Sequence, residues 1–201
     1  MPLSCTVPSL FGMKAIRIHE YGDASTLRYE DAPKPEIAGN EVRVRVRAAG
    51  VNPVDWKIRE GYLKEMLPYP MPLILGWDVS GEVEAVGDEV RDFKVGDEVY
   101  SRPNIARDGS YAEFVSVAAS EVALKPKSLS HAEAASVPLA AITAWQGLFA
   151  IAKLKKGQTV LIHGASGGVG SFAVQLAKHV GATVVGTGSA RSKAHLEELG
   201  V

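Results

Sequence analysis

A glycine-rich run, HGASGGVG at residues 163–170, lies between an apolar stretch and a segment with the composition of a helix. Glycines this closely spaced let the backbone approach a ligand that side chains would keep away. The pattern Ala165-x-Gly167-x-x-Gly170 is the dinucleotide fingerprint with alanine in place of its first glycine. Free N–H groups at the start of the following helix would bind a pyrophosphate. A tight strand-to-helix turn without a ligand is the alternative. We predict a dinucleotide-binding loop made of Ala165, Ser166, Gly167, Gly168, Val169 and Gly170.

The segment after the next apolar run decides between two nicotinamide dinucleotides. An acid about 20 residues beyond the fingerprint would hold the ribose 2′-hydroxyl of NAD, but GTGSARSK has no carboxylate and the first one is Glu197. Ser189, Arg191 and Lys193 instead offer a hydroxyl and two cations, which suit a 2′-phosphate. The sequence therefore favours NADPH as the cofactor. An ordinary basic loop before the next helix is the alternative.

The sequence on either side of this loop indicates the strands and helices that position it. TVLI and ATVVGT, on either side of the expected helix, have the composition of strands. Upstream, Ser130 and Glu133 form a capping box, and the helix-rich segment after them is broken once, at Pro138. We therefore predict that residues 129–201 form the dinucleotide-binding part of the chain.

Residues 13–128 have a different character. MKAIRIHEYG, EVRVRVRAAGV, VSGEVEAVG, DEVYS and YAEFVSV are short, often alternating runs separated by turn-forming residues, which is typical of antiparallel strands. Arg43, Arg45 and Arg47 alternate with valines and therefore share one face of a strand. We interpret that face as solvated, and a nucleic-acid patch is the alternative.

The composition limits partners and location. With 201 residues, 46% of them hydrophobic, the chain can bury a core in one or two domains, and its net charge of −1 gives no general attraction to nucleic acid or membranes. No apolar run approaches the roughly 20 residues that span a bilayer. Residues 1–12 lack the pattern of a signal peptide, so we interpret them as a loose tail. The single cysteine, Cys5, excludes an internal disulfide and favours the cytoplasm.

Four motifs resemble, in order, the zinc-independent quinone oxidoreductase (zeta-crystallin-like) branch of the medium-chain dehydrogenase/reductase superfamily: GVNPVDWKIREG, GWDVSGEVEAVG, GSYAEFV and VLIHGASGGVG. The resemblance extends from Met13 to the C-terminus. It implies an α/β chain with a GroES-like partly open β-barrel followed by the first part of a Rossmann domain, with the active site in the cleft between them. It also implies a cytoplasmic, homodimeric, NADPH-dependent oxidoreductase acting on a small-molecule quinone or enone.

The differences from the zinc-dependent branch imply a site without metal. Asn52 stands where those alcohol dehydrogenases have a catalytic cysteine, and Trp77 where they have a histidine. The five histidines have no metal-ligand spacing, and we interpret His163 as a packed strand residue rather than a ligand. Without a Lewis acid simple alcohols are poor substrates, whereas quinones and α,β-unsaturated carbonyls spread the negative charge that hydride brings.

By the same resemblance, Asn52 is a polar group beside the nicotinamide and the substrate, with Lys57 and Tyr62 as nearby hydrogen-bond donors. Some members of the branch have a tyrosine at the position aligned with Lys57, which leaves the identity of that donor open. Thr143 is similar to a position that meets the nicotinamide end of the cofactor, with an ordinary helix-interior threonine as the alternative.

Three further residues keep two interpretations each. Asp78 matches the acidic residue of a Gly-x-Asp/Glu motif, and it either orients polar groups of the site or ties down a turn. Trp56 and Trp77 either wall an apolar pocket or fill the core.

The pattern supplies one strand, one helix and a second strand, whereas a dinucleotide fold uses two such halves. We therefore expect either a fragment of a longer enzyme or a truncated product. Two functions follow from this: an NADPH-dependent reductase, at least in a longer parent, or a non-catalytic nucleotide-binding or interaction module.

Overall fold

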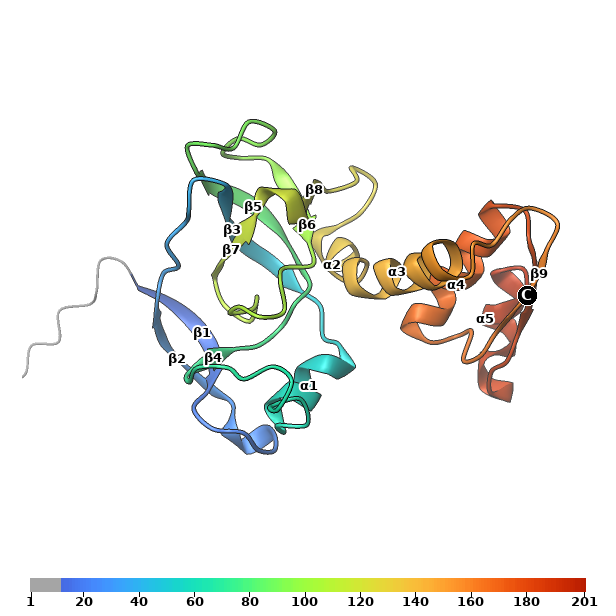
Figure 1. The fold of residues 1–201 in the computed structure, drawn as a ribbon, viewed down its shortest axis with the longest axis horizontal. Coiled ribbons are helices and arrows are strands. Elements are labelled where there is room, and N and C mark those ends of the chain that lie inside the picture. Colours follow the sequence, from blue (N-terminus) through green and yellow to red (C-terminus); the bar gives the residue numbers. More distant parts are fainter. Residues whose placement is uncertain (1–11) are drawn as a thin grey trace, which may run out of the picture. The chain divides into compact units, whose positions relative to one another are not determined.

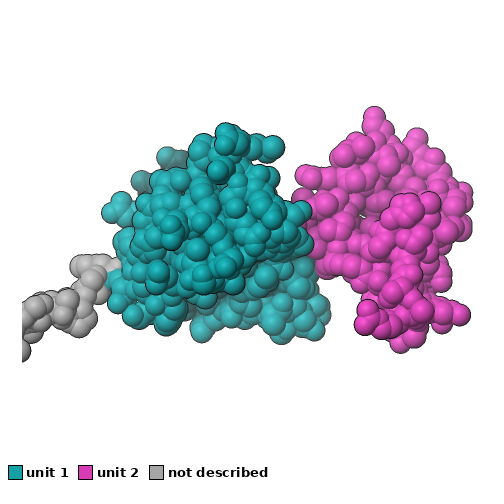
Figure 2. Space-filling view, turned by 90° about the horizontal axis from the view of Figure 1, so that it is seen from below, with its two compact units in different colours: residues 1–138 teal, residues 139–201 magenta. Residues whose placement is uncertain are grey.

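The computed structural model describes residues 12–201, which form two compact units. The first unit extends to Pro138 and the second comprises Leu139–Val201; Figure 2 colours them separately, and each is described by itself. The predicted tail, with Cys5, lies outside the described residues except for Gly12, which begins the first strand.

A five-stranded antiparallel sheet forms the centre of the first unit, in the order β7-β3-β5-β6-β8 (Figure 1). Alternating valines build its core because every second side chain of a strand points to the same face. Val42 and Val44 of the inner strand β3 are completely buried. The strands are β3 (Glu41–Ala49), β5 (Val79–Val86), β6 (Glu98–Ser101), β7 (Phe114–Ala118) and β8 (Val122–Leu124).

The alternating arginines of β3 face acidic and aromatic side chains. Arg43 Nε lies 2.7 Å from Glu84 Oε2, and Arg47 Nη2 lies 3.0 Å from Glu82 Oε2. The Arg45 guanidinium lies 5.0 Å from the centre of the Phe114 ring. Two of the three arginines are therefore paired with carboxylates of the neighbouring strand β5, as expected of a solvated sheet face, while Arg45 packs on β7.

A smaller antiparallel sheet completes the partly open barrel, in the order β2-β1-β4. A bridge between Ala15 and Ala112 links it to the segment before β7. Trp77 and Ile18 are fully buried in the cluster that this sheet shares with the helix α1. The elements are β1 (Gly12–Ile18), the 3₁₀ turn Ala24–Thr26, β2 (Arg28–Pro33), α1 (Pro53–Arg59), β4 (Leu73–Ile74) and the 3₁₀ turn Ala119–Glu121.

Helix α2 (His131–Ala135) belongs to the barrel unit, because it packs on β3, β5 and β6. The predicted capping box is present: Glu133 N–H donates to Ser130 Oγ, and Ser130 N–H donates to Glu133 Oε2. His131 contacts the Ser80 hydroxyl on β5 and Glu98 on β6, at 2.8 and 3.1 Å. The chain therefore divides after Pro138, ten residues later than the predicted boundary.

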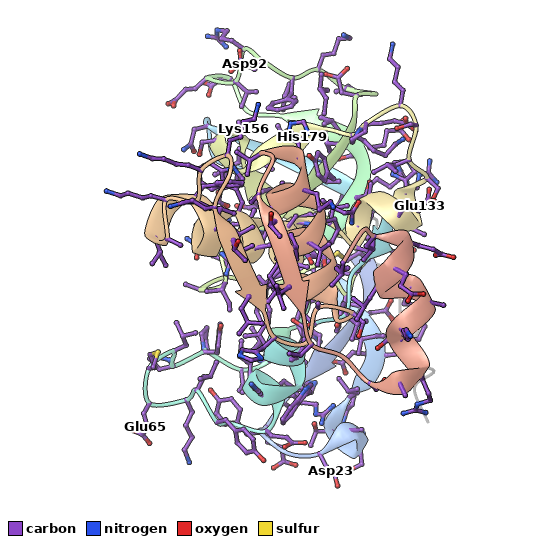
Figure 3. The ribbon with its side chains drawn as sticks, turned by 90° about the vertical axis from the view of Figure 1, so that its right-hand side faces the viewer. Asp23, Glu65, Asp92, Glu133, Lys156 and His179 are labelled. Atoms are coloured by element: carbon purple, nitrogen blue, oxygen red, sulfur yellow. The ribbon has the colours of Figure 1, made fainter. Side chains whose placement is uncertain are left out.

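The second unit contains a single βαβ motif. Strands β9 (Thr159–Ile162) and β10 (Thr183–Gly186) pair in parallel, and α4 (Gly168–His179) connects them. Figure 3 shows the two strands side by side, with Lys156 and His179 at the end of the unit where the strands begin. The remaining elements are α3 (Pro138–Trp145), its π-helical continuation Gln146–Ile151, the 3₁₀ turn Ala190–Ser192 and α5 (Lys193–Glu198).

Only one face of this small sheet is covered. Val160 and Ile162 pack with α4, while Leu161 and Val185, paired on the opposite face, are 55% and 49% exposed. Among residues 12–201, no helix is long and apolar enough to cross a membrane.

Candidate functional site

The glycine loop after β9 contains two positions at which a side chain would be strained or would clash with the backbone. Gly164 adopts a left-handed conformation with φ of +62°, and Gly167 caps the N-terminus of α4 in an extended conformation. A Cβ on Gly170 would lie 2.2 Å from the Gly164 carbonyl oxygen, whereas one on Gly168 would meet nothing within 4 Å. Gly170 therefore closes the loop against the helix, and Gly168 leaves open space above it.

The start of α4 presents unpaired donors to that space. Ser171 N–H donates to the Gly167 carbonyl at 2.8 Å, which is the first bond of the helix. The N–H groups of Gly168, Val169 and Gly170 precede that bond and have no acceptor within the helix. Together with the positive end of the dipole of this 12-residue helix, they form a cradle that fits a pyrophosphate.

The loop is tied to the end of β10, where the cofactor-selecting residues were predicted. Ala165 N–H donates to the Thr187 carbonyl at 2.9 Å, and Gly164 N–H donates to the Thr187 hydroxyl at 3.1 Å. His163 is exposed beyond the strand, with Nδ1 3.3 Å from that hydroxyl. The prediction that His163 is a packed strand residue is therefore wrong, because β9 ends at Ile162.

A hollow of about 320 Å³ lies at the carboxyl end of β10 and includes Ser189 and Lys193 in its wall. Arg191 belongs to the adjoining 3₁₀ turn and does not line this hollow. Glu197 does line it, and its Oε1 lies 3.7 Å from Lys193 Nζ. Sequence reasoning passed over Glu197 as too distant, although its spacing of four residues from Lys193 on a helix predicts this contact.

In the barrel unit, Asn52 is held between two buried carboxylates. Its side-chain Nδ2 donates to Asp78 Oδ2 at 2.9 Å, and its backbone N–H donates to Asp55 Oδ2 at 2.7 Å. Asp78 is 1% exposed and Asp55 is 3% exposed. Asn52 is the N-cap of α1. Pro53 follows at the first helical position, where its nitrogen carries no hydrogen and therefore needs no acceptor. Asp78 was interpreted either as orienting polar groups of the site or as tying down a turn. The structure shows its carboxylate in contact with Asn52, a predicted site residue.

Asp55 was not among the predicted site residues. Its Oδ2 also accepts a hydrogen bond from the Tyr111 hydroxyl at 2.8 Å. Burial raises the pKa of the Asp55 carboxyl, and the hydrogen bonds from Asn52 and Tyr111 counteract this. Burial also raises the pKa of Tyr111, and the negative charge of Asp55 adds to that effect. Asp55 and Tyr111 are 56 positions apart in the sequence, which explains why no local pattern indicated this contact.

Lys57 and Tyr62 lie close together on the surface of the barrel unit. The rings of Trp56 and Tyr62 meet edge to face with centroids 5.7 Å apart, and Lys57 Nζ lies 5.7 Å from the Trp56 ring. Tyr62 is 66% exposed and Trp56 is 40% exposed. A hydrogen bond to Glu60 raises the pKa of Tyr62. The cluster offers an aromatic surface, a cation and a phenol to a ligand.

The other two predicted positions have ordinary structural contacts. Trp77 is fully buried, and its indole N–H donates to the Arg107 carbonyl at 3.0 Å, so it fills the core. Thr143, on α3 in the second unit, is exposed and donates to the Leu139 carbonyl at 2.7 Å. That bond leaves the Thr143 oxygen free only as an acceptor.

A larger hollow of about 610 Å³ in the barrel unit contains none of the predicted site residues. Its cationic side chains are all paired with carboxylates: Arg17 with Glu30, Lys34 with Glu84 and Arg107 with Glu41. Within residues 12–201, no group of three or more His, Cys, Asp or Glu side chains is arranged to hold a metal ion.

The chain is similar to known proteins in both sequence and fold. Residues 38–127 match the alcohol dehydrogenase GroES-like domain. The chain is 43% identical to the mitochondrial NAD(P)H oxidoreductase RTN4IP1 of Danio rerio, covering 94% of this chain and 53% of that protein. It is 42% identical to 2-methylene-furan-3-one reductase of Solanum lycopersicum, covering 96% of this chain and 51% of that protein. The chain thus spans about half the length of these curated relatives.

Three solved structures share its fold over 94% of the chain. An alcohol dehydrogenase superfamily protein of Novosphingobium aromaticivorans has a TM-score of 0.88 and 38% identity, with 57% of its own chain covered. The quinone oxidoreductase of Coxiella burnetii has a TM-score of 0.81 and 38% identity, with 61% covered. A mycobacterial protein complexed with NADPH has a TM-score of 0.82 and 37% identity, with 56% covered.

Proposed function

Because this chain belongs to the quinone oxidoreductase family of medium-chain dehydrogenases/reductases, we propose that its parent protein reduces quinones or α,β-unsaturated carbonyl compounds with NADPH and without zinc. The observation that carries the proposal is the glycine cradle at the start of α4, with its three unpaired N–H groups and the open space over Gly168. NADPH, when bound, supplies the hydride. The residues of this chain bind the cofactor, orient the substrate and select NADPH over NADH.

The preference for NADPH rests on the hollow beyond β10. Lys193 is 75% exposed, so its ammonium group is free to meet a 2′-phosphate, and the exposed Ser189 hydroxyl lines the same wall. Glu197 works against that choice, because its carboxylate repels a phosphate and can accept a bond from the ribose hydroxyl of NADH. We expect a preference for NADPH that Glu197 limits.

The proposed substrate class rests on the residues around α1. Asn52 is fixed by two buried acids, so its remaining amide N–H and its carbonyl oxygen keep one orientation toward a ligand. Lys57 is an exposed donor that can meet a developing enolate or phenolate oxygen, and the Tyr62 hydroxyl can do so only by giving up its hydrogen bond to Glu60. Neither Asn52 nor Trp77 supplies the thiolate or imidazole of a zinc site, which supports acceptors that need no Lewis acid.

Calorimetric titration of the 201-residue chain with NADPH and NADH tests the cofactor part of the proposal. Turnover of a quinone, an enone and a simple alcohol by the longer parent protein tests the chemistry. We expect at most weak NADPH binding by the 201-residue chain, and oxidation of NADPH by the longer parent with the conjugated acceptors alone. Binding without turnover of any acceptor would favour a non-catalytic nucleotide-binding module, and robust alcohol oxidation would contradict the zinc-free chemistry.

A further inference from the structure

We propose that Tyr111 is a positioning residue for Asn52 and acts through the buried carboxylate of Asp55. The inference rests on the proposed function in one respect only, the role of Asn52 beside the substrate. Tyr111 lies in the motif GSYAEFV, which the functional assignment used solely as a mark of the family. Its hydroxyl completes a hydrogen-bonded network that ends at Asn52, the N-cap of α1.

The two hydrogen bonds converge on one oxygen of Asp55. The Tyr111 hydroxyl donates to Asp55 Oδ2 at 2.8 Å, and the Asn52 backbone N–H donates to the same oxygen at 2.7 Å. The other oxygen, Asp55 Oδ1, is buried and has no hydrogen-bond partner among the described residues. Both favourable contacts of a buried charge therefore fall on one oxygen, and Tyr111 provides one of the two.

The Tyr111 ring has little freedom to move. A Cβ on Gly76, which has a φ of +90°, would lie 2.3 Å from Tyr111 Cδ1, so the ring lies directly against that glycine. Tyr111 N–H donates to the Leu75 carbonyl at 3.0 Å, and the Tyr111 carbonyl accepts from Ile16 N–H at 2.7 Å. The barrel core thus fixes the hydroxyl, and the hydroxyl in turn fixes Asp55.

Removing the hydroxyl affects Asn52 through Asp55. Asp55 keeps only the Asn52 donor, so its pKa, already raised by burial, rises further because one stabilising hydrogen bond to the charged form is lost. A neutral Asp55 then accepts a weaker bond from the Asn52 N–H. The ionisable groups of the network are Asp55, Tyr111 and Asp78, which holds the Asn52 side chain.

Amide exchange and NMR titration of the 201-residue chain test the proposal without any need for activity. In Tyr111→Phe we expect the Asn52 backbone amide to exchange about tenfold faster, in line with the loss of one charge-assisted bond. We also expect the Asn52 amide signals to titrate with a higher midpoint. The matched control is Tyr69→Phe, because the Tyr69 hydroxyl also lies in this core and donates to the Ile105 carbonyl at 2.6 Å.

Asp55→Asn keeps the inference testable if Tyr111→Phe does not fold. Its amide oxygen can still accept both bonds but carries no charge, so we expect the Asn52 backbone amide to exchange faster than in the unchanged chain, and the part of the Asn52 pH dependence that Asp55 causes to disappear. Equal effects of Tyr111→Phe and Tyr69→Phe on Asn52, no effect of either, or an Asn52 backbone titration in Asp55→Asn that is identical to that of the unchanged chain would each overturn the proposal.

Activity of the longer parent provides a separate readout. With Tyr111→Phe we expect kcat to fall about tenfold at an almost unchanged KM for NADPH. An unchanged kcat would contradict the positioning role. If the unsubstituted parent turns over no acceptor, the proposed function fails, and the NMR comparison still decides whether Tyr111 positions Asn52.

Discussion

At the scale of single residues, Gly168 and Gly170 of the glycine loop have different roles. Gly170→Ala would force a Cβ against the Gly164 carbonyl, and we expect it to destabilise the second unit by about 1–3 kcal/mol. Gly168→Ala places a methyl group in open space on a helix, so the unfolding free energy should be unchanged or slightly higher. Its methyl group would instead obstruct a bound phosphate and weaken NADPH binding.

Urea unfolding and NADPH titration of both variants provide the measurement. A strongly destabilised Gly168→Ala variant, or one that binds NADPH as the unchanged chain does, would contradict the assignment of Gly168 to the ligand.

The residues after β10 give a prediction about cofactor choice. Replacing both Arg191 and Lys193 by alanine should weaken NADPH binding by roughly 30-fold to 1000-fold, at one charge-assisted contact each, and leave NADH binding almost unchanged. Calorimetric titration with each cofactor measures the ratio. Glu197→Gln is the converse variant and should tighten NADPH binding. Equal losses for the two cofactors in the double variant would refute the assignment.

The sequence predicted some residues of the site and missed others for a physical reason. The glycine loop, Ser189 and Lys193 are encoded by short local spacings, and the structure brings them to adjoining positions. The Asp55–Tyr111 contact joins residues that are distant in sequence, and only the register of the barrel brings them together. Trp77 allowed two interpretations because an aromatic side chain serves equally well in a core and in a pocket wall.

At the scale of elements, Glu41 ties the start of β3 to β7 and to the loop before it. Its carboxylate accepts from Arg107, from Ser116 at 2.7 Å and from the backbone N–H of Ala38 at 3.0 Å. The Arg107 guanidinium is the main cause that lowers the pKa of Glu41 to about 2. A pKa below the unfolded value of 4.5 means that this stabilisation is present above pH 4.5 and is lost as the pH falls toward 2.

We therefore expect Glu41→Gln to lower the unfolding free energy of the barrel by about 1–3 kcal/mol at pH 7, since Arg107 is half exposed and solvent weakens the pair. The difference from the unchanged chain should shrink progressively below pH 4.5. Denaturant titrations at pH 7 and near pH 2.5 measure it. A difference that stays constant across this range would contradict the charge-based explanation.

Prediction of elements from the sequence succeeded for most strands of the barrel, although the six-residue strand β2 was missed because RYEDAP shows no apolar alternation. The runs now seen as β1, β3, β5, β6 and β7 were expected as antiparallel strands, and the structure confirms them. Strand β4 has two residues and β8 has three, which is too short for an alternation to be recognised. The helix interruption at Pro138 was predicted because proline has no N–H to donate.

At the scale of the whole molecule, the two units differ in how completely their sheets are covered. The strands of the larger sheet lie over a buried valine core, whereas β9 and β10 form a two-stranded sheet with Leu161 and Val185 exposed. Sheets with few strands and an exposed face open more readily. We therefore expect amide exchange in residues 158–201 to be faster than in β3 and β5.

Hydrogen exchange followed by mass spectrometry of the 201-residue chain measures this difference directly. Similar protection of β9 and β3 would show that the second unit is as stable as the barrel. Added NADPH should slow exchange in the glycine loop and at the start of α4 before it affects the barrel strands.

The division into a β unit and a predicted dinucleotide-binding unit could be predicted from the sequence, because the short runs separated by turn-forming residues give way to a helix-rich segment after the strands. The position of the division could not, since α2 has the local pattern of a helix whichever unit it joins. Its packing on β3, β5 and β6, with His131 between Ser80 and Glu98, assigns it to the barrel. Such long-range contacts carry no signal in a single sequence.

The paired charges on β3 and β5 also have an evolutionary consequence. Reversing the sign of Arg43 alone would set two negative charges side by side, because Glu84 lies 2.7 Å away, whereas reversing both would restore the pair. Among descendants of a common ancestor, positions 43 and 84 should therefore change together, and so should 47 and 82. Position 45 should instead follow the aromatic side chain at 114, on which it lies. Correlated changes at these positions in related sequences would thus show how β3 is aligned with β5 and β7.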